Sequence, residues 1–409
     1  MRKFTSKALH LIFVSAIIFI VLNILSYILL PYLPSSNRKL ATYLSNDAEG
    51  FAKDLYTEMP AGYFEDVFTD VISYFQQGQS YFPHTEYCET PFRSKTLNIV
   101  TDPTGISYRS GFEPCFTQPD SSTTRIYVFG GSTSFGSFVA DKESWPAQLN
   151  KILNEKGKPV EVVNYAVQGG CVTEEFLRFY DLVKLGHRPA LVIVMDGVNL
   201  GGQADVSRYS NAIYNRIYEW QQSKIANAYV TRLFLNLPVM KALVALAPGK
   251  VLEYLYSMKY TEDNGTSPLE SKNDPQLVRN YINRFNAGIS DFQYLCNKHH
   301  IKFLYFLQPN AFYNYPRQSP EIENPDFSKD LDTIFTGVKL ANPNQVLDLS
   351  NLFSKYGKKA IVDNCHYSVA FNTFVATEVA GYIKIDSLPP SYINSRAATG
   401  TRFTFFTTE

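Results

Sequence analysis

The chain has 409 residues, of which 45% are hydrophobic, 15% aromatic and 19% charged, a composition typical of a globular protein rather than a disordered or fibrous one. Its 38 basic and 38 acidic side chains give a formal net charge of zero. A chain with no net charge and no block of like charges shows no sign of nucleic-acid binding. The length allows one large domain with accessory segments, or two domains.

The N-terminus carries a long apolar segment. Leu11 to Leu30 contains no charged residue, and a helix of about twenty residues spans about 30 Å, the thickness of a bilayer core. A cleaved signal peptide would have a shorter apolar stretch with small residues at its end, whereas Pro31 and Pro34 follow this one. We therefore predict one transmembrane anchor within residues 1–34, with a buried core helix as the alternative. More basic residues precede the segment than follow it, which favours a cytoplasmic N-terminus and an extracytoplasmic body, periplasmic if the source is bacterial.

Residues 35–122 follow as a membrane-proximal region. A short helical stretch is predicted near residues 51–75, and the Pro-, Gly-, Thr- and Ser-rich segment after it predicts loops with short strands. Its many aromatic residues predict that the region packs on the domain that follows. Cys88 and Cys115 lie here and are candidates for a disulfide if the body is extracytoplasmic.

From residue 123 to 386 the sequence alternates between strand and helix patterns. Short apolar runs bounded by glycines or turns predict buried strands, and amphipathic stretches between them predict helices. The predicted strands are residues 125–129, 160–167, 191–195, 301–307 and 346–349, and the predicted helices begin near residues 144, 174, 275 and 368. This order predicts a parallel α/β sheet covered on both faces. An insertion at about 200–274 interrupts the domain, and a tail covers residues 387–409.

Polar loops follow the first three predicted strands, at the sheet edge where open parallel sheets bind ligands. In Gly130-Gly131-Ser132, two glycines allow a sharp turn that presents the serine hydroxyl and leaves the serine amide free to donate. A phosphate-binding loop or a plain turn is the alternative, although the lysine of a P-loop is absent. The loops at residues 164–170 and 196–199 offer a glycine amide and the Asn199 side chain as oxyanion donors, yet each alone also fits ordinary turn chemistry.

A fourth polar segment, Val362-Asp363-Asn364-Cys365-His366, precedes the last predicted helix. A serine hydroxyl becomes nucleophilic when a base removes its proton, and the base must be oriented by a third group. Asp363 and His366 are three residues apart and can form a carboxylate–imidazole bond locally. The other histidines have no such partner motif, so His366 is the best candidate base. No grouping of His, Cys and Asp shows the sequence spacing of a metal site, and we expect neither a metal nor another cofactor.

Taken in order, FGGSTSFG, NYAVQGG, MDGVN and DNCH resemble four conserved blocks of the SGNH/GDSL hydrolase superfamily. The doubled glycine is similar to that of bacterial membrane-anchored members, and the resemblance covers about residues 125–383, apart from the insertion. It implies a flavodoxin-like three-layer α/β/α fold, the SGNH hydrolase fold, with Ser132, Asp363 and His366 as the catalytic triad. It also implies an oxyanion hole formed by the amide of Ser132 with Gly169 and Asn199.

The sequence departs from the superfamily pattern at two positions. Gly131 replaces the aspartate of the GDS form, which is not catalytic, and Leu200 replaces the common aspartate after Asn199, where it bears on how that asparagine is held. If the loops converge as the resemblance implies, the sulfurs of Cys171 and Cys365 approach each other, and we predict a disulfide between them.

The function implied is a membrane-anchored serine esterase that acts through an acyl-enzyme on an ester substrate, with an acetylated envelope glycan as the expected class. An O-acyltransferase of cell-surface polysaccharide would use the same residues. A non-catalytic carbohydrate-binding scaffold is the alternative from another class of protein.

Overall fold

The computed structural model describes residues 2–29, 53–77, 80–82, 86–116, 123–155, 157–197, 199, 237–239, 275–310, 325–363 and 365–393. The chain divides into two compact units, residues 1–51 with 207–266, and residues 52–206 with 267–409. In the first unit the described residues are the helix α1 (Arg2–Leu29) and residues 237–239. Over the described residues, no helix combines the length and hydropathy needed to cross a membrane. The predicted insertion and tail lie largely outside the described residues.

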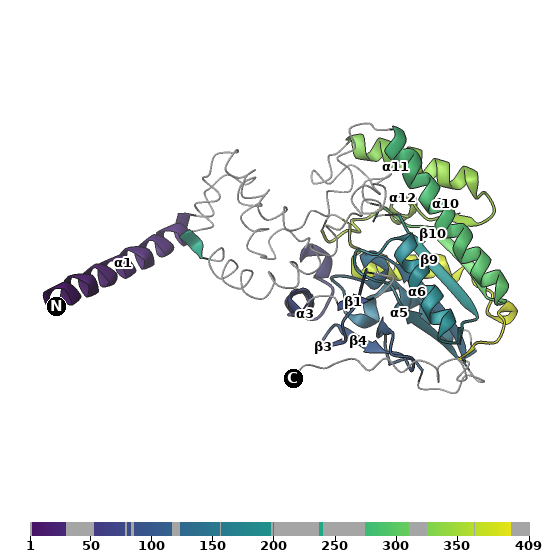
Figure 1. The fold of residues 1–409 in the computed structure, drawn as a ribbon, viewed down its shortest axis with the longest axis horizontal. Coiled ribbons are helices and arrows are strands. Elements are labelled where there is room, and N and C mark those ends of the chain that lie inside the picture. Colours follow the sequence, from purple (N-terminus) through teal and green to yellow (C-terminus); the bar gives the residue numbers. More distant parts are fainter. Residues whose placement is uncertain are drawn as a thin grey trace. The chain divides into compact units, whose positions relative to one another are not determined.

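The second unit is built on an eight-stranded sheet with the order β11-β10-β9-β6-β7-β5-β4-β3 (Figure 1). Its five parallel strands are β6 (Thr124–Gly130), β7 (Val160–Asn164), β9 (Leu191–Asp196), β10 (Lys302–Leu307) and β11 (Val346–Asp348). They confirm the predicted strands and their parallel arrangement, although the strand predicted to reach residue 167 ends at Asn164. In chain order, the five strands lie side by side as second, first, third, fourth and fifth, which is the flavodoxin-like order.

An antiparallel extension prolongs this sheet beyond β7. It consists of β3 (Phe92–Arg93), β4 (Asn98–Thr101) and β5 (Ser107–Arg109), and β5 pairs with β7 opposite Asn164. Residues 53–116 contribute four further elements: η3 (Lys53–Tyr56), α3 (Tyr63–Gln77), and the hairpin of β1 (Ser80–Phe82) with β2 (Glu86–Cys88). This N-terminal segment therefore supplies strands to the same sheet as the α/β core.

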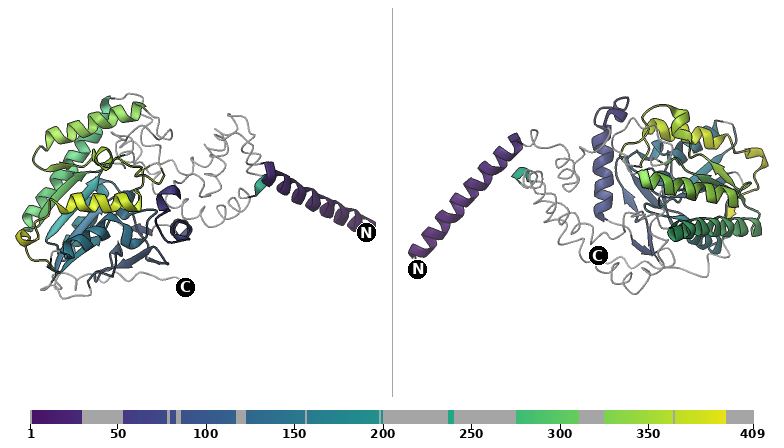
Figure 2. Two further views of the ribbon diagram at one scale, coloured as in Figure 1. Left: turned by 180° about the vertical axis from the view of Figure 1, so that it is seen from behind. Right: turned by 90° about the horizontal axis from the view of Figure 1, so that it is seen from above.

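Helices cover both faces of the sheet, and in the view from behind α13 lies across the strands (Figure 2). One face packs against α5 (Trp145–Asn154), α12 (Leu352–Tyr356) and α13 (Val369–Ala380), and the other against α6 (Val172–Lys184), α10 (Pro275–Lys298) and α11 (Pro325–Ala341). Side chains of β6 alternate between the two cores, Ile126 and Val128 in one and Tyr127 and Phe129 in the other. The fold is thus a mixed α/β fold with a mostly parallel central sheet.

Local sequence signals account for where the helices begin. Ser144 stands at the N-cap position of α5, with a proline in the first turn, but its hydroxyl donates to the Asp141 carbonyl at 2.9 Å and does not cap the helix. The Ser368 hydroxyl does cap α13, by accepting from the Phe371 amide at 3.3 Å. The remaining short elements are α4 (Ser132–Phe135), η5 (Asp141–Glu143), β8 (His187–Arg188), η7 (Ile385–Ser387) and β12 (Tyr392–Ile393). Of these, α4 carries the predicted nucleophile.

Candidate active site

Ser132 is the first residue of the one-turn helix α4, directly after β6. Its side chain is half-buried, whereas Thr133, Ser134 and Phe135 are buried. The first amides of a helix have no acceptor within the helix, so the Ser132 amide is oriented to donate outward. Nucleophile and amide donor thus lie together at the carboxyl end of a central strand.

The two glycines before Ser132 are needed for different reasons. Gly130 has a φ of +153°, which side chains rarely allow, and a Cβ there would lie 2.5 Å from the Met195 carbonyl oxygen. Gly131 has an ordinary φ of −80°, but a Cβ there would overlap the Asn199 side-chain amide and approach the Gly170 carbonyl oxygen to 3.2 Å. In this chain the close approach of Asn199 and Gly170, and not the backbone angle, leaves no room for a side chain at position 131.

Replacing Gly131 by alanine is expected to lower kcat/KM for ester hydrolysis by about 10- to 100-fold, because the added methyl group must push the Asn199 amide or the turn before Ser132 out of place. Gly111→Ala is the matched control, since a Cβ there meets only the Ala147 side chain at 3.4 Å, an ordinary contact. Steady-state kinetics of both variants check the expectation. Equal rates for the two variants would contradict it.

The second and third loops are joined to the first by hydrogen bonds. The Val167 amide donates to the Gly130 carbonyl at 3.0 Å, and the Asn199 side-chain amide donates to the Gly170 carbonyl at 2.8 Å. A primary amide has two N–H donors, so this bond leaves one to meet a ligand. Gly169 lies between these contacts with a φ of +77°. The structure thus gathers Ser132, Gly169 and Asn199 at one sheet edge.

Asp363 and His366 form a direct pair. The imidazole Nδ1 lies 2.6 Å from Asp363 Oδ2, while Asp363 Oδ1 accepts the backbone amides of Cys365 at 2.9 Å and His366 at 2.8 Å. With Nδ1 donating to the carboxylate, Nε2 is the nitrogen that can accept a proton. The carboxylate therefore holds the ring in the tautomer and orientation that a general base needs.

Charge pairing decides the pKa values of both groups. Burial opposes the charged form of Asp363, but the neighbouring His366 and the two backbone amides outweigh it and lower the pKa of Asp363. Burial also opposes a charged His366, yet the Asp363 carboxylate holds the pKa of the imidazole well above its usual value. The pair is thus poised to stabilise an imidazolium.

Neighbours of Ser132 and His366 bring the two segments together. Thr133 donates to the Gln308 side chain at 3.2 Å, and the Tyr367 hydroxyl donates to the Pro309 carbonyl at 2.6 Å, so both are tied to the loop after β10. Burial raises the pKa of Tyr367 well above its ordinary value. Between the described side chains of Ser132 and His366 there is no direct hydrogen bond. Such bonds are often long before a substrate binds.

The sequence matches the GDSL-like lipase/acylhydrolase family over residues 126–379, which is more than half of the chain and includes every loop of this site. The chain belongs to the GDSL-like lipase/acylhydrolase family. Membership makes it an ester-bond hydrolase by class. No curated protein matches the sequence.

Three solved structures illustrate the low similarity of this GDSL-like chain to known enzymes. The acetyl xylan esterase AlAXEase is 15% identical, with 64% of this chain and 100% of that chain covered and a TM-score of 0.36. Axe2, an acetylxylan esterase from Geobacillus stearothermophilus, is 12% identical, with coverage of 63% and 94% and a TM-score of 0.35. The psychrotrophic esterase EstA from Pseudoalteromonas sp. is 11% identical, with coverage of 63% and 95% and a TM-score of 0.34.

This structure of the GDSL-like hydrolase forms neither predicted disulfide, and Cys88, Cys115, Cys171 and Cys365 each carry an unbridged thiol. Cys171 is the N-cap residue of α6, and its thiol donates to the Glu174 carboxylate at 2.8 Å. The Cys365 thiol lies against the His366 ring, and the Cys115 thiol faces the Val162 carbonyl at 3.7 Å. Each of these three thiols therefore has a polar neighbour of its own.

Asp363, Cys365 and His366 form a grouping that their sequence spacing did not indicate. One ligand-type atom from each lies within 4.8 Å of the others, close enough to hold a metal ion. The Cys365 sulfur is 3.6 Å from Nδ1 and 3.8 Å from Nε2, so it lies beside the ring and not along one nitrogen lone pair. Since Nδ1 is already bonded to the carboxylate, the geometry fits a hydrogen-bonded pair better than a preformed metal site.

Two buried carboxyl groups lie behind the oxyanion loops. Both Glu175 oxygens and the Asp196 Oδ2 have no hydrogen-bond partner in the described part of the chain. Asp196 Oδ1 accepts the Gly197 amide at 2.7 Å. Burial raises the pKa of Asp196 to about 7, and burial with the nearby Asp196 and Glu174 raises the pKa of Glu175 well above its usual value.

These raised pKa values predict how stability depends on pH. Each folded carboxyl retains a proton that the unfolded chain loses above its ordinary pKa, near 4, so stability falls as pH rises from there towards the folded pKa, about 7 for Asp196. Glu175→Gln removes one buried acid and is expected to stabilise the protein by about 1–3 kcal/mol at mildly alkaline pH and to flatten the decline. Thermal unfolding across a pH series measures this.

Glu174→Gln is the control for that variant. The Glu174 carboxylate accepts the Cys171 amide at 3.1 Å and its thiol, so its loss weakens the start of α6 and is expected to destabilise the protein. A Glu175→Gln protein less stable than wild type at alkaline pH would contradict the expectation.

Proposed function

We propose that the chain is a membrane-anchored serine hydrolase that cleaves ester bonds through Ser132, His366 and Asp363. The observation that carries the proposal is the 2.6 Å contact between His366 Nδ1 and Asp363 Oδ2, because it leaves Nε2 as the base on a segment that shares the loop after β10 with the nucleophile turn.

The reaction proceeds in two steps in this proposal. The Ser132 oxygen attacks the ester carbonyl while its proton passes to Nε2 of His366, and the oxyanion accepts hydrogen bonds from the amides of Ser132 and Gly169 and from the Asn199 side chain. The ester C–O bond breaks, and His366 returns the proton to the leaving alcohol. Water then attacks the acyl-serine with the same base, releasing the carboxylic acid and restoring the serine hydroxyl.

Membrane attachment and substrate class complete the proposal. The uncharged segment Leu11–Leu30 supports an anchor, and within α1 the described apolar side chains are exposed, Phe13 by 63% and Ile20 by 57%. The charge bias around this segment supports an extracytoplasmic catalytic unit. An acetylated envelope glycan is the substrate class we propose for that location.

Labelling with a serine-directed phosphonate tests the chemistry on the full-length protein in detergent. We expect one adduct, located on Ser132 by peptide mass mapping, together with turnover of p-nitrophenyl acetate. A protein that takes up no label and turns over no ester would be a binding scaffold, and an adduct on another serine would exclude the proposed nucleophile. Acetate release from acetylated glycans in water, compared with acetyl transfer to an added glycan, separates the hydrolase from an acyltransferase.

A further inference from the structure

Arg109 is a buried cation that contacts the nucleophile turn from outside the family-matched residues. It ends β5 in the antiparallel extension, and its side chain is 1% exposed. On the basis of the proposed function, we infer that Arg109 is a positioning residue for Ser132. We also infer that the segment of residues 86–116, which contains the antiparallel extension, is part of the catalytic unit.

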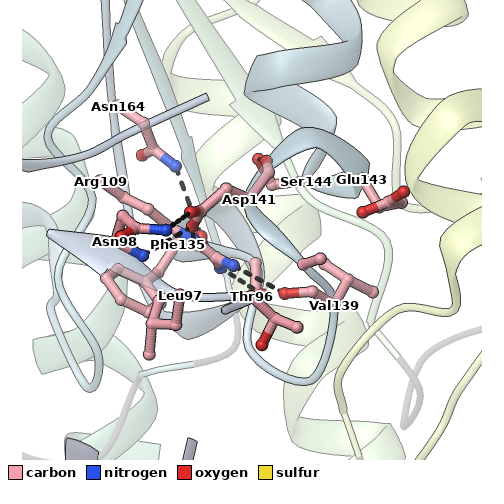
Figure 3. A network of polar contacts seen from close by, with 12 residues as sticks. Thr96, Leu97, Asn98, Arg109, Phe135, Val139, Asp141, Glu143, Ser144 and Asn164 are labelled. Carbon is pink, nitrogen blue, oxygen red and sulfur yellow. Dashed lines mark hydrogen bonds and ion pairs between the residues drawn. The ribbon is translucent and has the colours of Figure 1, made fainter. Parts of the chain in front are cut away.

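The guanidinium spans the end of the nucleophile turn (Figure 3). Its Nη1 donates to the carbonyls of Phe135 at 2.6 Å and Gly136 at 2.5 Å, and its Nη2 donates to the Val139 carbonyl at 2.6 Å. The same guanidinium lies 4.9 Å from the centre of the Phe135 ring. Three carbonyls that follow Ser132 are thus held by one rigid, planar group.

The contacts at the end of α4 affect the position of Ser132 because this helix is only one turn long. A helix of four residues does not persist without outside support, and a cation at its carboxyl end complements the unpaired carbonyls. The amides of Gly136 and Ser137 both donate to the Ser132 carbonyl, so moving this end displaces Ser132 as well. Asn164 holds the opposite side of the turn by donating to the Ser134 carbonyl at 3.0 Å.

Arg109 is itself held by the extension. Its Nε lies 2.9 Å from Asp141 Oδ1, and that carboxylate also accepts the backbone amide of Asn98 at 3.1 Å and its side chain at 2.8 Å. Asn98 begins β4, so strand, carboxylate and guanidinium form one connected network.

Glu89, which lies in the segment of residues 86–116 just before β3, contacts the oxyanion loop. The carboxylate of Glu89, which is buried, accepts the Gln168 backbone amide at 2.6 Å, one residue before Gly169. The Gln168 side chain in turn accepts the Ser137 hydroxyl at 3.0 Å, which links this loop back to the nucleophile turn. The segment of residues 86–116 therefore contacts both the nucleophile turn, through Arg109, and the oxyanion loop, through Glu89.

Arg125 provides a closely matched control. It is also buried, its Nε lies 2.8 Å from Glu161, and its guanidinium lies 4.9 Å from the Phe116 ring centre. It sits at the start of β6, whereas Ser132 follows the end of that strand. Arg125→Met and Arg109→Met thus each remove a buried ion pair and a guanidinium that stacks on an aromatic ring. Only Arg109→Met also removes contacts with the nucleophile turn.

The experiment uses full-length Arg109→Met, Arg109→Lys and Arg125→Met proteins in detergent. We expect both methionine variants to unfold at lower temperature, while the rate of phosphonate inactivation per folded molecule falls about 30- to 100-fold in Arg109→Met and less than about 3-fold in Arg125→Met. Arg109→Lys, which can donate to some of the same carbonyls, is expected to recover part of the rate and stands in if Arg109→Met does not fold.

Amide hydrogen exchange decides the inference independently of activity. Residues 135–137 donate within or next to α4, and we expect their exchange to accelerate at least tenfold in Arg109→Met but not in Arg125→Met. Equal exchange and equal inactivation rates in the two variants would overturn the positioning role. If the wild-type protein takes up no phosphonate, that result counts against the proposed function but not against the role of Arg109. The hydrogen-exchange comparison tests whether Arg109 stabilises the nucleophile turn without relying on activity.

Discussion

Replacing Ser132 by alanine is expected to lower kcat for p-nitrophenyl acetate by about 10⁴- to 10⁶-fold, with little change in the melting temperature. Only the hydroxyl group is removed, and the side chain that carries it is half-buried, so little packing is lost. The remaining rate over the uncatalysed reaction comes from substrate binding and the oxyanion donors, which the alanine variant retains.

Ser134→Ala is the control for this variant. Ser134 lies in the same one-turn helix, but its buried hydroxyl donates to the Met195 carbonyl at 3.3 Å and does not face a substrate. We expect a loss of less than about tenfold, since the hydroxyl forms a structural hydrogen bond. Activity that survives Ser132→Ala while falling in Ser134→Ala would remove Ser132 from the mechanism.

Replacing Asp363 by asparagine is expected to lower kcat by about 10⁴-fold while leaving the fold intact. The asparagine oxygen can still accept the amides of Cys365 and His366, which keeps the local turn. Its NH₂ group, however, faces Nδ1 as a donor, so the imidazole must present Nδ1 as acceptor and its Nε2 carries the proton. A ring in that tautomer cannot take the proton from Ser132.

The pH dependence of kcat/KM gives a second readout for the same variant. The base must be neutral, so activity falls at low pH as His366 becomes protonated. Asp363 raises the pKa of His366, and its loss is therefore expected to move the acidic limb of the residual activity to lower pH. A limb that stays in place would show that the two side chains are not coupled in the working enzyme.

Asp348→Asn is the matched control for Asp363→Asn. Asp348 also accepts a nearby backbone amide, that of Ser350 at 2.9 Å, and pairs with Lys339 at 2.8 Å, but it contacts no imidazole. Replacing it is expected to change stability slightly and to leave kcat within about twofold. Equal losses in the two variants would point to general damage and not to a catalytic carboxylate.

Most of the parallel core was predictable because its signals are local. The five strands are short apolar runs, and the helices beginning at Trp145 and Val369 follow a serine at the capping position. The helix Pro325–Ala341 was missed, although Leu331, Ile334, Phe335 and Val338 form a fully buried stripe at helical spacing. The pairing of Asp363 with His366 was also predictable, since three residues separate them.

The contacts of Arg109 and Glu89 were not predictable in this way. Each lies in a segment rich in turn-forming residues, and a charged residue there normally indicates a solvated surface. Arg109 is brought into the interior by the antiparallel pairing of β5 with β7 opposite Asn164. This pairing joins residues that are far apart in the chain. The same limit applies to Cys171 and Cys365, because the sequence does not show that their thiols contact Glu174 and His366.

By itself, the sequence indicated the strands, the order of the polar loops and the local pairing of Asp363 with His366, because periodicity and short-range spacing encode them. The resemblance to the SGNH/GDSL superfamily supplied the candidate nucleophile. Only the tertiary structure decided that Asn199 and Gly170 leave no room for a side chain at position 131, that the four cysteines carry unbridged thiols, and that Arg109 contacts the nucleophile turn. Those outcomes depend on distances between side chains brought together by folding, and no local pattern of residues specifies such distances.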